Sequence, residues 1–387
     1  MGESLTTEIR SRKILMIAGE SSGDLHGAHL IRSLRIKEPQ IEIYGAGGSQ
    51  MLSAGQRQEF DMTEHAVVGL IEVAKHYSKF RGFFKRLLNL VERIRPDAII
   101  LIDYPGFNLR FAKAVKELYP SIPLIQYICP QVWAWKSGRA KMMESVFDSV
   151  MSIFPFEEAW MLKAAPKLKV KWVGHPTKDR ILPIPEEYRD QKRIALLPGS
   201  REDEIKKHFP ILFNAAVLMS QRIPDLKFVW VAPDEKIFKL GNKLLDGLSR
   251  SSIHLESYIG YSLTHLSRCK LAIVASGTAS LECAFAGVPP VVVYKVNPFT
   301  FAVGKRLVKV KYLSMVNVLA NAPVVPEILQ NELTAPFLAQ ETHRLLIDQE
   351  RYQTIQEKMK KIVDTLGEPG VSAIAAEWVL SRISSGE

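Results

Sequence analysis

The sequence predicts an α/β protein made of two Rossmann-like domains, each built on a parallel sheet. Short apolar strands alternate with helical patterns along the 387 residues, and nothing reads as a series of hairpins. Strands are expected at residues 13–19, 41–47, 98–103, 124–130 and 149–155 in the first half, and at 193–200, 227–233, 253–259, 271–276 and 290–294 in the second. The length, with 47% hydrophobic and 24% charged residues, also favours two globular domains over one.

A charged stretch with three prolines, residues 174–191, indicates where the domains meet. We therefore expect a first domain over residues 1–175, a linker over 176–191, a second domain over 192–355, and a helical tail over 356–387 that returns to the first domain. Two such domains facing one another would form a cleft at the carboxyl ends of their strands, where open α/β folds bind ligands.

The segment IVASGTASLECAFAGVPPVVVY, residues 273–294, predicts a strand, a small-residue turn, a helix that ends at Gly287, and a second strand. The first N–H groups of such a helix have no partner within it and attract an anion. The ligand should therefore carry phosphate. The residues expected to hold it are Ser276, Gly277, Thr278 and Ala279. Glu282, one helical turn beyond Thr278, is a candidate acceptor for sugar hydroxyls.

A second glycine loop, LLPGSREDEI, ends the first strand of the second domain. Ser200 and Arg201 follow its glycine, and Glu204 begins a helix whose N-terminus is again expected to favour an anion. Arginine offers a phosphate two parallel donors, although an exposed structural arginine is the alternative. Because neither half shows clustered carboxylates or histidines, we expect no metal site, and no bound cofactor is indicated.

Polar residues also follow strands of the first domain. AGESSGDLHG places Glu20, Ser22 and Asp24 at a strand end, in a pattern that matches neither a dinucleotide fingerprint nor a P-loop. Asp103 ends the apolar run AIILI before a Pro-Gly turn, where a carboxylate can act as a general base on a hydroxyl. The alternative is that Asp103 and Asn108 only cap the turn and the next helix.

The net charge of +10 indicates an acidic partner. Basic residues stand beside apolar ones at residues 75–95 and 305–313. In the first segment the spacing is helical, with the apolar residues Phe80, Phe83, Phe84 and Leu87 and the basic residues Lys79, Arg81, Lys85 and Arg86. This composition is typical of a helix on an anionic membrane, and an amphipathic core helix with a solvated basic face is the alternative. No nucleic-acid motif accompanies the charge, so no nucleic-acid partner is expected.

No apolar run has the length of a membrane span, and no signal-peptide core precedes the first strand, so a cytoplasmic protein is expected. The three cysteines are too scattered for a disulfide framework or a metal site, and we expect them in the core or in pockets.

Eight ordered motifs resemble those of the lipid A disaccharide synthase family. They are AGESSGD, IDYPGFN, CPQVWAW, PGSREDEI, ASGTASLE, NPFTF, KRLVKVKYLSMVNVLA and VPEILQ. The resemblance covers residues 13–330. It implies the glycosyltransferase type B fold and a role in lipopolysaccharide biosynthesis of Gram-negative bacteria. In that family UDP-2,3-diacylglucosamine is joined to 2,3-diacylglucosamine 1-phosphate, called lipid X, in a β-1,6 linkage. UDP leaves with inversion and without a metal ion.

The resemblance also implies roles for the residues above. The SGTA turn would receive the UDP diphosphate, supported by Ser200 and Arg201, while Glu282 meets the ribose and Asn317 lies near the nucleotide. Asp103 would be the catalytic base, and Glu20, Ser22 and Asp24 would line the acceptor side. Because acylated substrates stay in the membrane, the enzyme is expected to sit on the cytoplasmic face of the inner membrane. A homodimer is left open.

Two other functions fit part of the pattern. A UDP-N-acetylglucosamine 2-epimerase would share the phosphate loops but would need no acylated substrate and no basic, apolar segment. A non-catalytic, nucleotide-responsive membrane protein would keep the SGTA turn but would have no use for a carboxylate at Asp103.

Overall fold

The computed structural model describes residues 11–63, 77–134, 137–180, 184–248, 253–260, 262–297 and 310–383, with the side chains of 77–80 excepted. The chain divides into two compact units. The first, called unit 1, comprises Met1–Asp179 and Gly367–Glu387, and unit 2 comprises Arg180–Leu366. Each unit is built on its own parallel sheet, so the predicted fold class is confirmed.

Unit 1 contains a seven-stranded sheet in the order β3-β2-β1-β4-β5-β6-β7, with every pair parallel. Its strands are β1 (Lys13–Ala18), β2 (Glu42–Gly47), β3 (Arg57–Asp61), β4 (Ala98–Ile102), β5 (Leu124–Tyr127), β6 (Ser149–Ser152) and β7 (Lys169–Trp172). The order of the strands reverses between β1 and β4. That point is where ligands bind in open parallel sheets.

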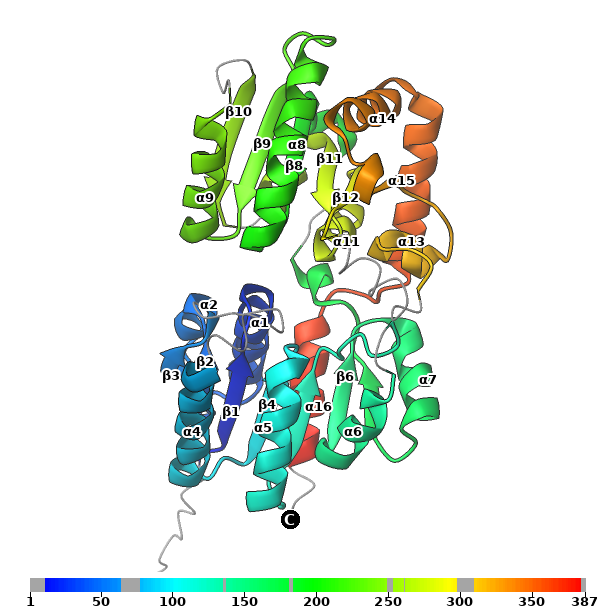
Figure 1. Cartoon of the computed structure of the whole chain (residues 1–387). Coiled ribbons are helices and arrows are strands. Elements are labelled where there is room, and N and C mark those ends of the chain that lie inside the picture. Colours follow the sequence, from blue (N-terminus) through cyan, green and yellow to red (C-terminus); the bar gives the residue numbers. More distant parts are fainter. Residues whose placement is uncertain are drawn as a thin grey trace, which may run out of the picture. The chain divides into compact units, whose positions relative to one another are not determined.

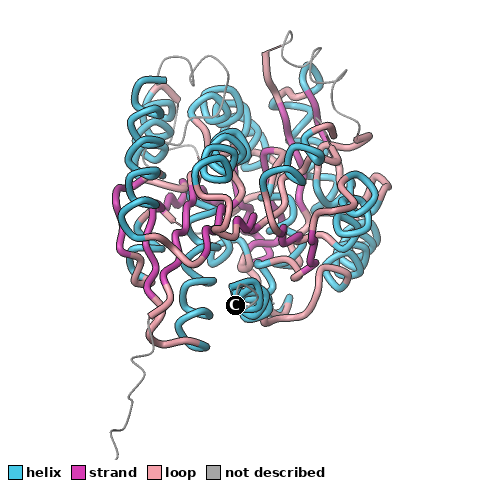
Figure 2. Tube along the Cα trace, turned by 90° about the horizontal axis from the view of Figure 1, so that it is seen from below, coloured by secondary structure: helices cyan, strands magenta, loops and turns pink. Residues whose placement is uncertain are grey.

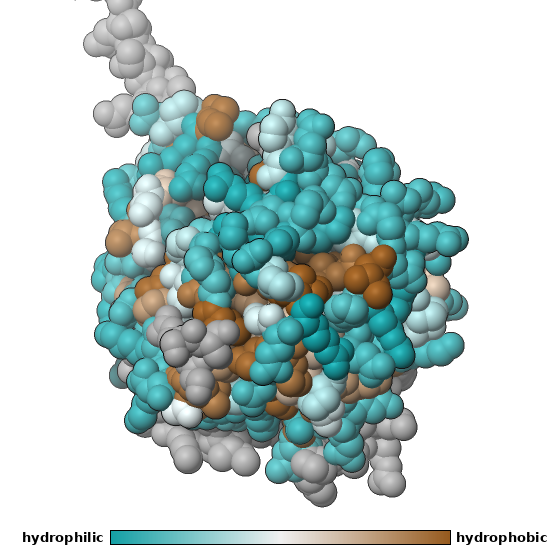
Figure 3. All heavy atoms as spheres, turned by 90° about the horizontal axis from the view of Figure 1, so that it is seen from above, coloured by the Kyte–Doolittle hydropathy of each residue, from teal (hydrophilic) through white to brown (hydrophobic). Residues whose placement is uncertain are grey.

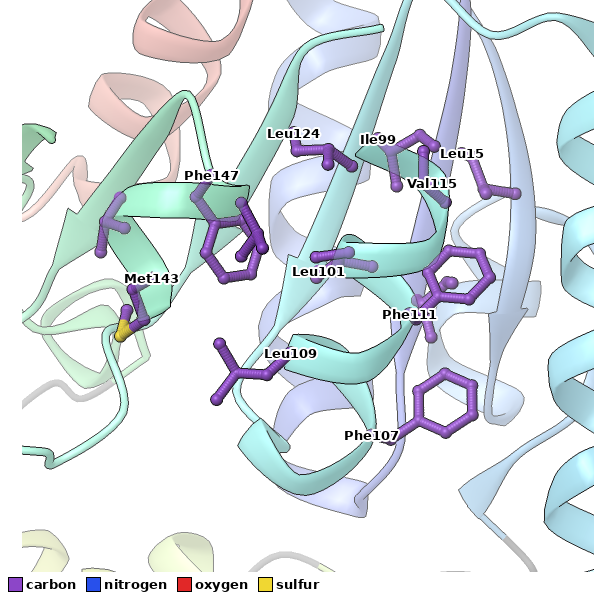
Figure 4. Close-up of a cluster of buried hydrophobic side chains, with 14 of the residues drawn as sticks. Leu15, Ile99, Leu101, Phe107, Leu109, Phe111, Val115, Leu124, Met143 and Phe147 are labelled. Atoms are coloured by element: carbon purple, nitrogen blue, oxygen red, sulfur yellow. The ribbon is translucent and has the colours of Figure 1, made fainter. Parts of the chain in front are cut away.

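Helices cover both faces of this sheet (Figures 1 and 2). They are α1 (Ser21–Lys37), α2 (Ser49–Ser53), α4 (Tyr77–Ile94), α5 (Pro105–Leu118), α6 (Arg139–Val146), α7 (Pro155–Ala164) and α16 (Val371–Ile383). On one face α1 packs beside α16, and on the other α4, α5 and α6 cover a cluster of buried hydrophobic side chains. Figure 4 shows Phe111 and Val115 of α5 beside Leu101 and Ile99 of β4.

Unit 2 contains a six-stranded parallel sheet in the order β10-β9-β8-β11-β12-β13. Its strands are β8 (Asp190–Leu197), β9 (Lys227–Ala232), β10 (His254–Ile259), β11 (Cys269–Ala275), β12 (Pro290–Tyr294) and β13 (Glu327–Leu329). Its helices are α8 (Glu202–Ser220), α9 (Glu235–Asp246), α10 (Ser262–Leu266), α11 (Thr278–Ala286), α13 (Met315–Ala320), α14 (Ala335–Ile347) and α15 (Gln349–Asp364). Here the order reverses between β8 and β11.

All ten predicted strands are present, and the three that the sequence analysis omitted lie at sheet edges. These are β3, β7 and β13, with the sequences RQEFD, KVKW and EIL. An edge strand faces solvent and can be short and polar, so it lacks the apolar run by which central strands are recognised.

The C-terminal helix α16 belongs to unit 1, as predicted. Asp179 ends the first passage through this unit, and its carboxylate accepts hydrogen bonds from the backbone N–H groups of Gly370, Val371 and Ser372, at 2.7–2.9 Å. One side chain therefore caps the helix with which the chain returns.

None of the helices in the described ranges combines the length and the apolar character needed to cross a bilayer. Figure 3 shows one face of the molecule, where hydrophilic side chains cover most of the surface and hydrophobic ones gather in smaller groups.

Candidate functional site

Two predicted loops of unit 1 lie side by side because β1 and β4 are neighbours. Ala18 pairs with Ile102, so the residues that follow each strand leave the sheet at the same point. The fit is tight, since a Cβ atom on Gly19 would collide with the ring of Tyr104. The switch point of the sheet thus carries both Glu20 and Asp103.

Asp103 lies in a strained turn that buried amides hold in place. Asp103 and Tyr104 have φ of +45° and +41°, in the left-handed region that costs on the order of 1–3 kcal/mol per non-glycine residue. Asn108 Nδ2 donates to the carbonyl oxygens of Ile102, at 3.2 Å, and of Asp103, while Gln126 Nε2 donates to that of Asp103 at 3.1 Å. Asn108 therefore fixes the backbone of the turn that carries the Asp103 side chain.

A second carboxylate, Glu157 of α7, is fully buried near this turn. It accepts hydrogen bonds from Trp133 Nε1 at 2.8 Å and from the backbone N–H groups of Ile153 and Phe154 at 3.1 Å. Burial raises the pKa of Glu157 to about 7, despite these three donors, and the negative charge of Asp103 adds to the rise. The carboxyl groups of Asp103 and Glu157 are thus coupled electrostatically.

Sequence reasoning missed two of these residues, Gln126 and Glu157. Gln126 is an amide inside the buried strand LIQY, and its side chain is 1% exposed. Glu157 stands three residues after Phe154, at the position from which a glutamate caps a helix N-terminus. A polar residue in a buried strand and a glutamate in a first turn were the signals available.

The three residues predicted on the acceptor side separate into two groups. Glu20 immediately precedes α1 and is half-buried, and Ser22 in the first turn is exposed, so both lie at the switch point. Asp24 is 4% exposed, and its carboxylate accepts hydrogen bonds from the backbone N–H groups of Gly48, Gln50 and Met51. Asp24 therefore caps α2, and contact between Asp24 and an acceptor stays a prediction.

In unit 2 the two predicted phosphate loops are also neighbours. Leu197 of β8 pairs with Val274 of β11, so residues 198–201 and 276–279 leave the sheet together at its switch point. Gly199 and Gly277 have φ of +127° and +147°, conformations that L side chains rarely adopt. The two glycines explain why both loops can turn so sharply.

The N-terminus of α11 is open. Among the described residues, nothing lies within 4 Å of the place where a Cβ atom on Gly277 would stand, and the first turn of the helix contains no acidic residue. The loop is fixed from behind, because Ser276 Oγ donates to the carbonyl of Leu313 and Ser280 Oγ to that of Gly277, each at 2.9 Å. Exposed N–H groups on a rigid turn suit an anion.

Glu282 lies on the second turn of α11 and is half-buried. One of its carboxylate oxygens accepts a hydrogen bond from Ser262 Oγ at 2.9 Å. This contact orients the side chain.

The N-terminus of α8 differs from that of α11. Glu204 Oε2 accepts hydrogen bonds from the backbone N–H groups of Ser200, at 3.0 Å, and Arg201, at 3.4 Å. Glu202 and Asp203 add negative charge in the same turn. Two N–H groups before the helix are therefore occupied and its first turn is acidic, which disfavours an anion, so anion binding at this N-terminus stays a prediction. Arg201 remains the anion-directed group of the loop.

The Arg201 guanidinium is 52% exposed, and its Nη1 atom lies 3.3 Å from Glu204 Oε1. An ion pair this exposed contributes at most about 1 kcal/mol, so a diphosphate can compete with Glu204 for the guanidinium.

Asn317 is 1% exposed, and all its polar atoms are engaged. Nδ2 donates to the carbonyl of Val325 and to Glu327 Oε1, and Oδ1 accepts from the N–H groups of Val324 and Val325, at 2.8–2.9 Å. An amide has two donor and two acceptor positions, and here all four are used. Asn317 therefore holds the segment before β13, and direct contact with a nucleotide stays a prediction.

The apolar side of α4 lies in the core of unit 1. Leu87 is fully buried, Phe83 stacks on Phe60 with ring centroids 4.5 Å apart, and Phe84 packs against Phe111 at 5.6 Å. The interpretation of these apolar residues as lipid-facing is therefore wrong, and the amphipathic core helix is correct for residues 81–94. The side chains of Lys79 and Phe80, and residues 305–309, lie outside the described residues.

Within the ranges that the structure describes, no three His, Cys, Asp or Glu side chains gather as metal ligands.

Comparisons with known proteins give the family. The family model described as Lipid-A-disaccharide synthetase matches residues 14–380. The curated Lipid-A-disaccharide synthase of Geobacter sulfurreducens is 35% identical, covering 97% of this chain and 99% of the relative. That of Syntrophus aciditrophicus is 34% identical, covering 98% and 100%.

Solved structures give the fold. The "S. aureus MnaA-UDP co-structure" matches with a TM-score of 0.65 and 15% identity over 96% of both chains. The UDP-GlcNAc 2-epimerase from Neisseria meningitidis bound to UDP-GlcNAc matches with a TM-score of 0.63 and 16% identity, over 95% of this chain and all of that one. At such identity these two structures show a shared architecture alone. The sequence relatives decide the family: this chain belongs to the Lipid-A-disaccharide synthetase family, and is a glycosyltransferase of lipid A biosynthesis.

Proposed function

We propose that the chain joins UDP-2,3-diacylglucosamine to 2,3-diacylglucosamine 1-phosphate, releasing UDP with inversion at the donor carbon and without a metal ion. The observation that carries the proposal is the pairing of β8 with β11, which brings Arg201 and the open N-terminus of α11 to one switch point. A diphosphate placed there meets both a guanidinium and unpaired N–H groups.

The acceptor is activated in unit 1. Asp103 takes the proton from the 6-hydroxyl of lipid X, and the resulting oxygen attacks the anomeric carbon of the donor sugar. The bond from that carbon to the UDP oxygen breaks on the opposite face, which inverts the configuration. Glu20 and Ser22 orient the acceptor, since both lie at the same strand ends as Asp103.

The leaving group is stabilised in unit 2. Negative charge grows on the UDP diphosphate as the bond breaks, and Arg201 with the N–H groups of residues 277–279 is arranged to meet it. Ser200 supports the same phosphates, and Glu282 accepts from the ribose hydroxyls. These fixed donors perform the role that a divalent cation has in many nucleotide-sugar enzymes, so turnover is expected to persist in excess EDTA.

The acylated substrates place the enzyme at the cytoplasmic face of the inner membrane. Among the described residues, Arg81 and Lys85 are exposed and lie one helical turn apart on α4. We assign them the contact with anionic lipid, in place of the buried phenylalanines.

The test measures UDP released from UDP-2,3-diacylglucosamine with and without lipid X, in the presence and absence of EDTA. Release is expected only with lipid X and at the same rate with the chelator. Acceptor-independent release, or a loss of activity in EDTA that magnesium reverses, would contradict the proposal.

Arg201→Ala should lower both turnover and UDP affinity, because one contact to a developing anion contributes roughly 3 kcal/mol in a closed site. Arg222→Ala, at an exposed residue two positions beyond the end of α8, is the matched control. Calorimetric titration with UDP should show the loss only for Arg201. Unchanged affinity and turnover in Arg201→Ala would remove this arginine from the site.

A further inference from the structure

His208 connects the loop that follows β8 to the backbone at the end of β12 in unit 2. It lies in α8, is fully buried, and has both ring nitrogens engaged. Nδ1 is 2.8 Å from the carbonyl oxygen of Pro198, just before Gly199, and Nε2 is 2.9 Å from the backbone nitrogen of Lys295, just after β12.

These partners determine the tautomer of the ring. The Lys295 N–H can only donate, so Nε2 must offer a lone pair. The Pro198 carbonyl can only accept, so Nδ1 must carry the hydrogen. The ring is therefore neutral. A second proton would place an N–H on Nε2 facing the N–H of Lys295, and one of the two contacts would be lost.

One contact lies in a phosphate loop, and the other lies at the end of the strand that borders the second loop. Pro198 is three residues before Arg201 in the loop that follows β8. Lys295 continues β12, whose Val293 carbonyl accepts a hydrogen bond from Ser276 N at 2.9 Å, at the start of the SGTA turn. One buried ring thus joins the Arg201 loop to the strand on which the other loop rests.

We propose that His208 is a positioning residue: its neutral ring holds residues 198–201 against the end of β12, and protonation of the ring releases this loop and weakens UDP binding. The inference rests on the proposed function, because it takes Arg201 to be a ligand of the UDP diphosphate. It adds a built-in dependence of that site on pH.

The charged and titratable surroundings set the pH range. Burial lowers the pKa of His208 below its usual value, Glu204 opposes this shift, and Lys207 reinforces it. On the β12 side the ring faces Tyr294, at a centroid distance of 6.2 Å, and Lys295. The contact is therefore intact near pH 7 and above, and is lost only as the pH falls through the lowered pKa.

The experiment compares three replacements. His208→Phe keeps the ring shape without either contact. His208→Asn can still donate to Pro198, and His208→Gln can reach the position of Nε2 and accept from Lys295. His254→Asn, an exposed histidine of β10, is the matched control. Each variant is titrated with UDP by calorimetry from pH 8 to pH 5.5, and hydrogen exchange is followed for residues 195–209 and 290–297.

At pH 8 His208→Phe should lose about tenfold in UDP affinity, the size expected for two buried hydrogen bonds, and His208→Asn should lose less. Exchange should quicken in both segments of His208→Phe while the β9 strand stays protected. The parent and the His254 variant should also lose more UDP affinity on acidification than any His208 variant. The terminal phosphate of UDP itself titrates at about pH 6. The loss of UDP affinity that this causes is measured in the His208 variants, which lack the titrating ring.

Three results decide between the explanations. Unchanged exchange in residues 198–201 of His208→Phe would overturn the proposal. Faster exchange with unchanged UDP affinity, while Arg201→Ala does weaken UDP, would also overturn it, since the loop would then bind UDP without this support. Faster exchange with UDP affinity unchanged in both His208→Phe and Arg201→Ala would support the positioning role and would contradict only the assignment of UDP to this loop.

Discussion

At the residue scale, the candidate residues of each unit depend on buried polar side chains that contact backbone. Asn108 and Gln126 hold the carbonyl of Asp103, and His208 holds that of Pro198. Each satisfies a backbone group that the turn leaves unpaired, which would otherwise cost about 1–3 kcal/mol when buried. The reactive groups can stand at strand ends because other residues pair the backbone beneath them.

Glu157 gives a prediction about pH. Its pKa is raised from an ordinary 4.5 to about 7, so between these values the folded protein holds a proton that the unfolded chain has released. The free energy of unfolding should therefore fall as the pH rises from 4.5 to 7, by on the order of 2–3 kcal/mol from this group. Urea unfolding across that range should show a smaller fall in Glu157→Gln than in the parent.

The neighbouring Glu158→Gln is the control for this measurement, because Glu158 is not buried and its carboxylate accepts a hydrogen bond from Trp172 N instead. Identical pH profiles for the parent and Glu157→Gln would show that the buried carboxyl titrates normally.

Replacement of Asn317 distinguishes a structural role of this residue from a direct contact with the nucleotide. Asn317→Ala leaves the N–H groups of Val324 and Val325 without their acceptor, so the free energy of unfolding should fall by about 2–3 kcal/mol. The exposed Asn331→Ala should change it little. UDP titration of the folded variant should show a loss below tenfold. A large loss of UDP affinity at an unchanged free energy of unfolding would show that Asn317 contacts the nucleotide directly.

The sequence predicted which strand ends carry polar residues, and it could do so because apolar runs ending in Gly, Ser or Asp are local patterns. It could not predict that Asn317 and Asp24 face inward. Whether a polar side chain contacts a ligand or a neighbouring backbone depends on partners distant in the chain, such as Gly48 for Asp24.

At the element scale, the two helices that follow the phosphate loops have opposite first turns. The first turn of α8 contains Glu202, Asp203 and Glu204, whereas that of α11 contains no acidic residue and has its N-cap at Gly277. A capped, acidic N-terminus repels phosphate and an open one attracts it. Of the two, only α11 should contribute its dipole to binding, while α8 contributes the position of Arg201.

Helix α4 gives the prediction at this scale. Arg81→Glu with Lys85→Glu reverses two exposed charges one turn apart, and each basic residue near an anionic surface contributes on the order of 1 kcal/mol. In a flotation experiment, a smaller fraction of the double variant should therefore bind to anionic vesicles. Raised salt should lower the bound fraction of the parent in the same way. UDP affinity should not change, and detergent-dispersed substrate should restore turnover.

Arg86 is left in place in this variant because its guanidinium donates to the carbonyl of Glu59 and lies over the Phe60 ring, so its replacement would disturb the fold. Lys239→Glu with Lys243→Glu, at the same spacing on α9, is the control for charge. Vesicle binding equal to that of the parent would remove α4 from the membrane contact.

The helical spacing of apolar residues in α4 was read correctly from the sequence, but what its apolar side contacts was not. A stripe of phenylalanines has the same pattern whether it faces lipid or the residues of another strand. Only the position of Phe60 on β3, an edge strand that the sequence did not reveal, distinguishes the two.

At the scale of the whole molecule, the described residues of each unit form a hydrophobic cluster of their own. The alternation of strands and helices was sufficient to predict two parallel sheets. The return of the chain to unit 1 rests on the long-range contact of Asp179 with the start of α16, which no local pattern shows.

Two matched caps test this architecture. Asp179→Ala removes the cap of α16 in unit 1, and Asp234→Ala removes that of α9 in unit 2, where Asp234 accepts from Ile237 N at 2.8 Å. Each loss should cost about 1–2 kcal/mol. In calorimetric unfolding, Asp179→Ala should lower the transition temperature of unit 1 alone, and Asp234→Ala that of unit 2 alone. UDP should raise the transition that Asp234→Ala lowers. A single transition shifted equally by both would show that the units unfold together.

The return of the chain to unit 1 also has a consequence for protein synthesis. Unit 2 is one continuous stretch, so all its strands are translated before residues 367–383. Until α16 emerges, the side of α1 against which it packs has no cover, although α1 itself was made near the beginning. The usual N-terminal-first order of domain folding is therefore reversed here, and the nascent chain carries an exposed apolar surface through the translation of nearly two hundred further residues, a period in which chaperones would be expected to bind it.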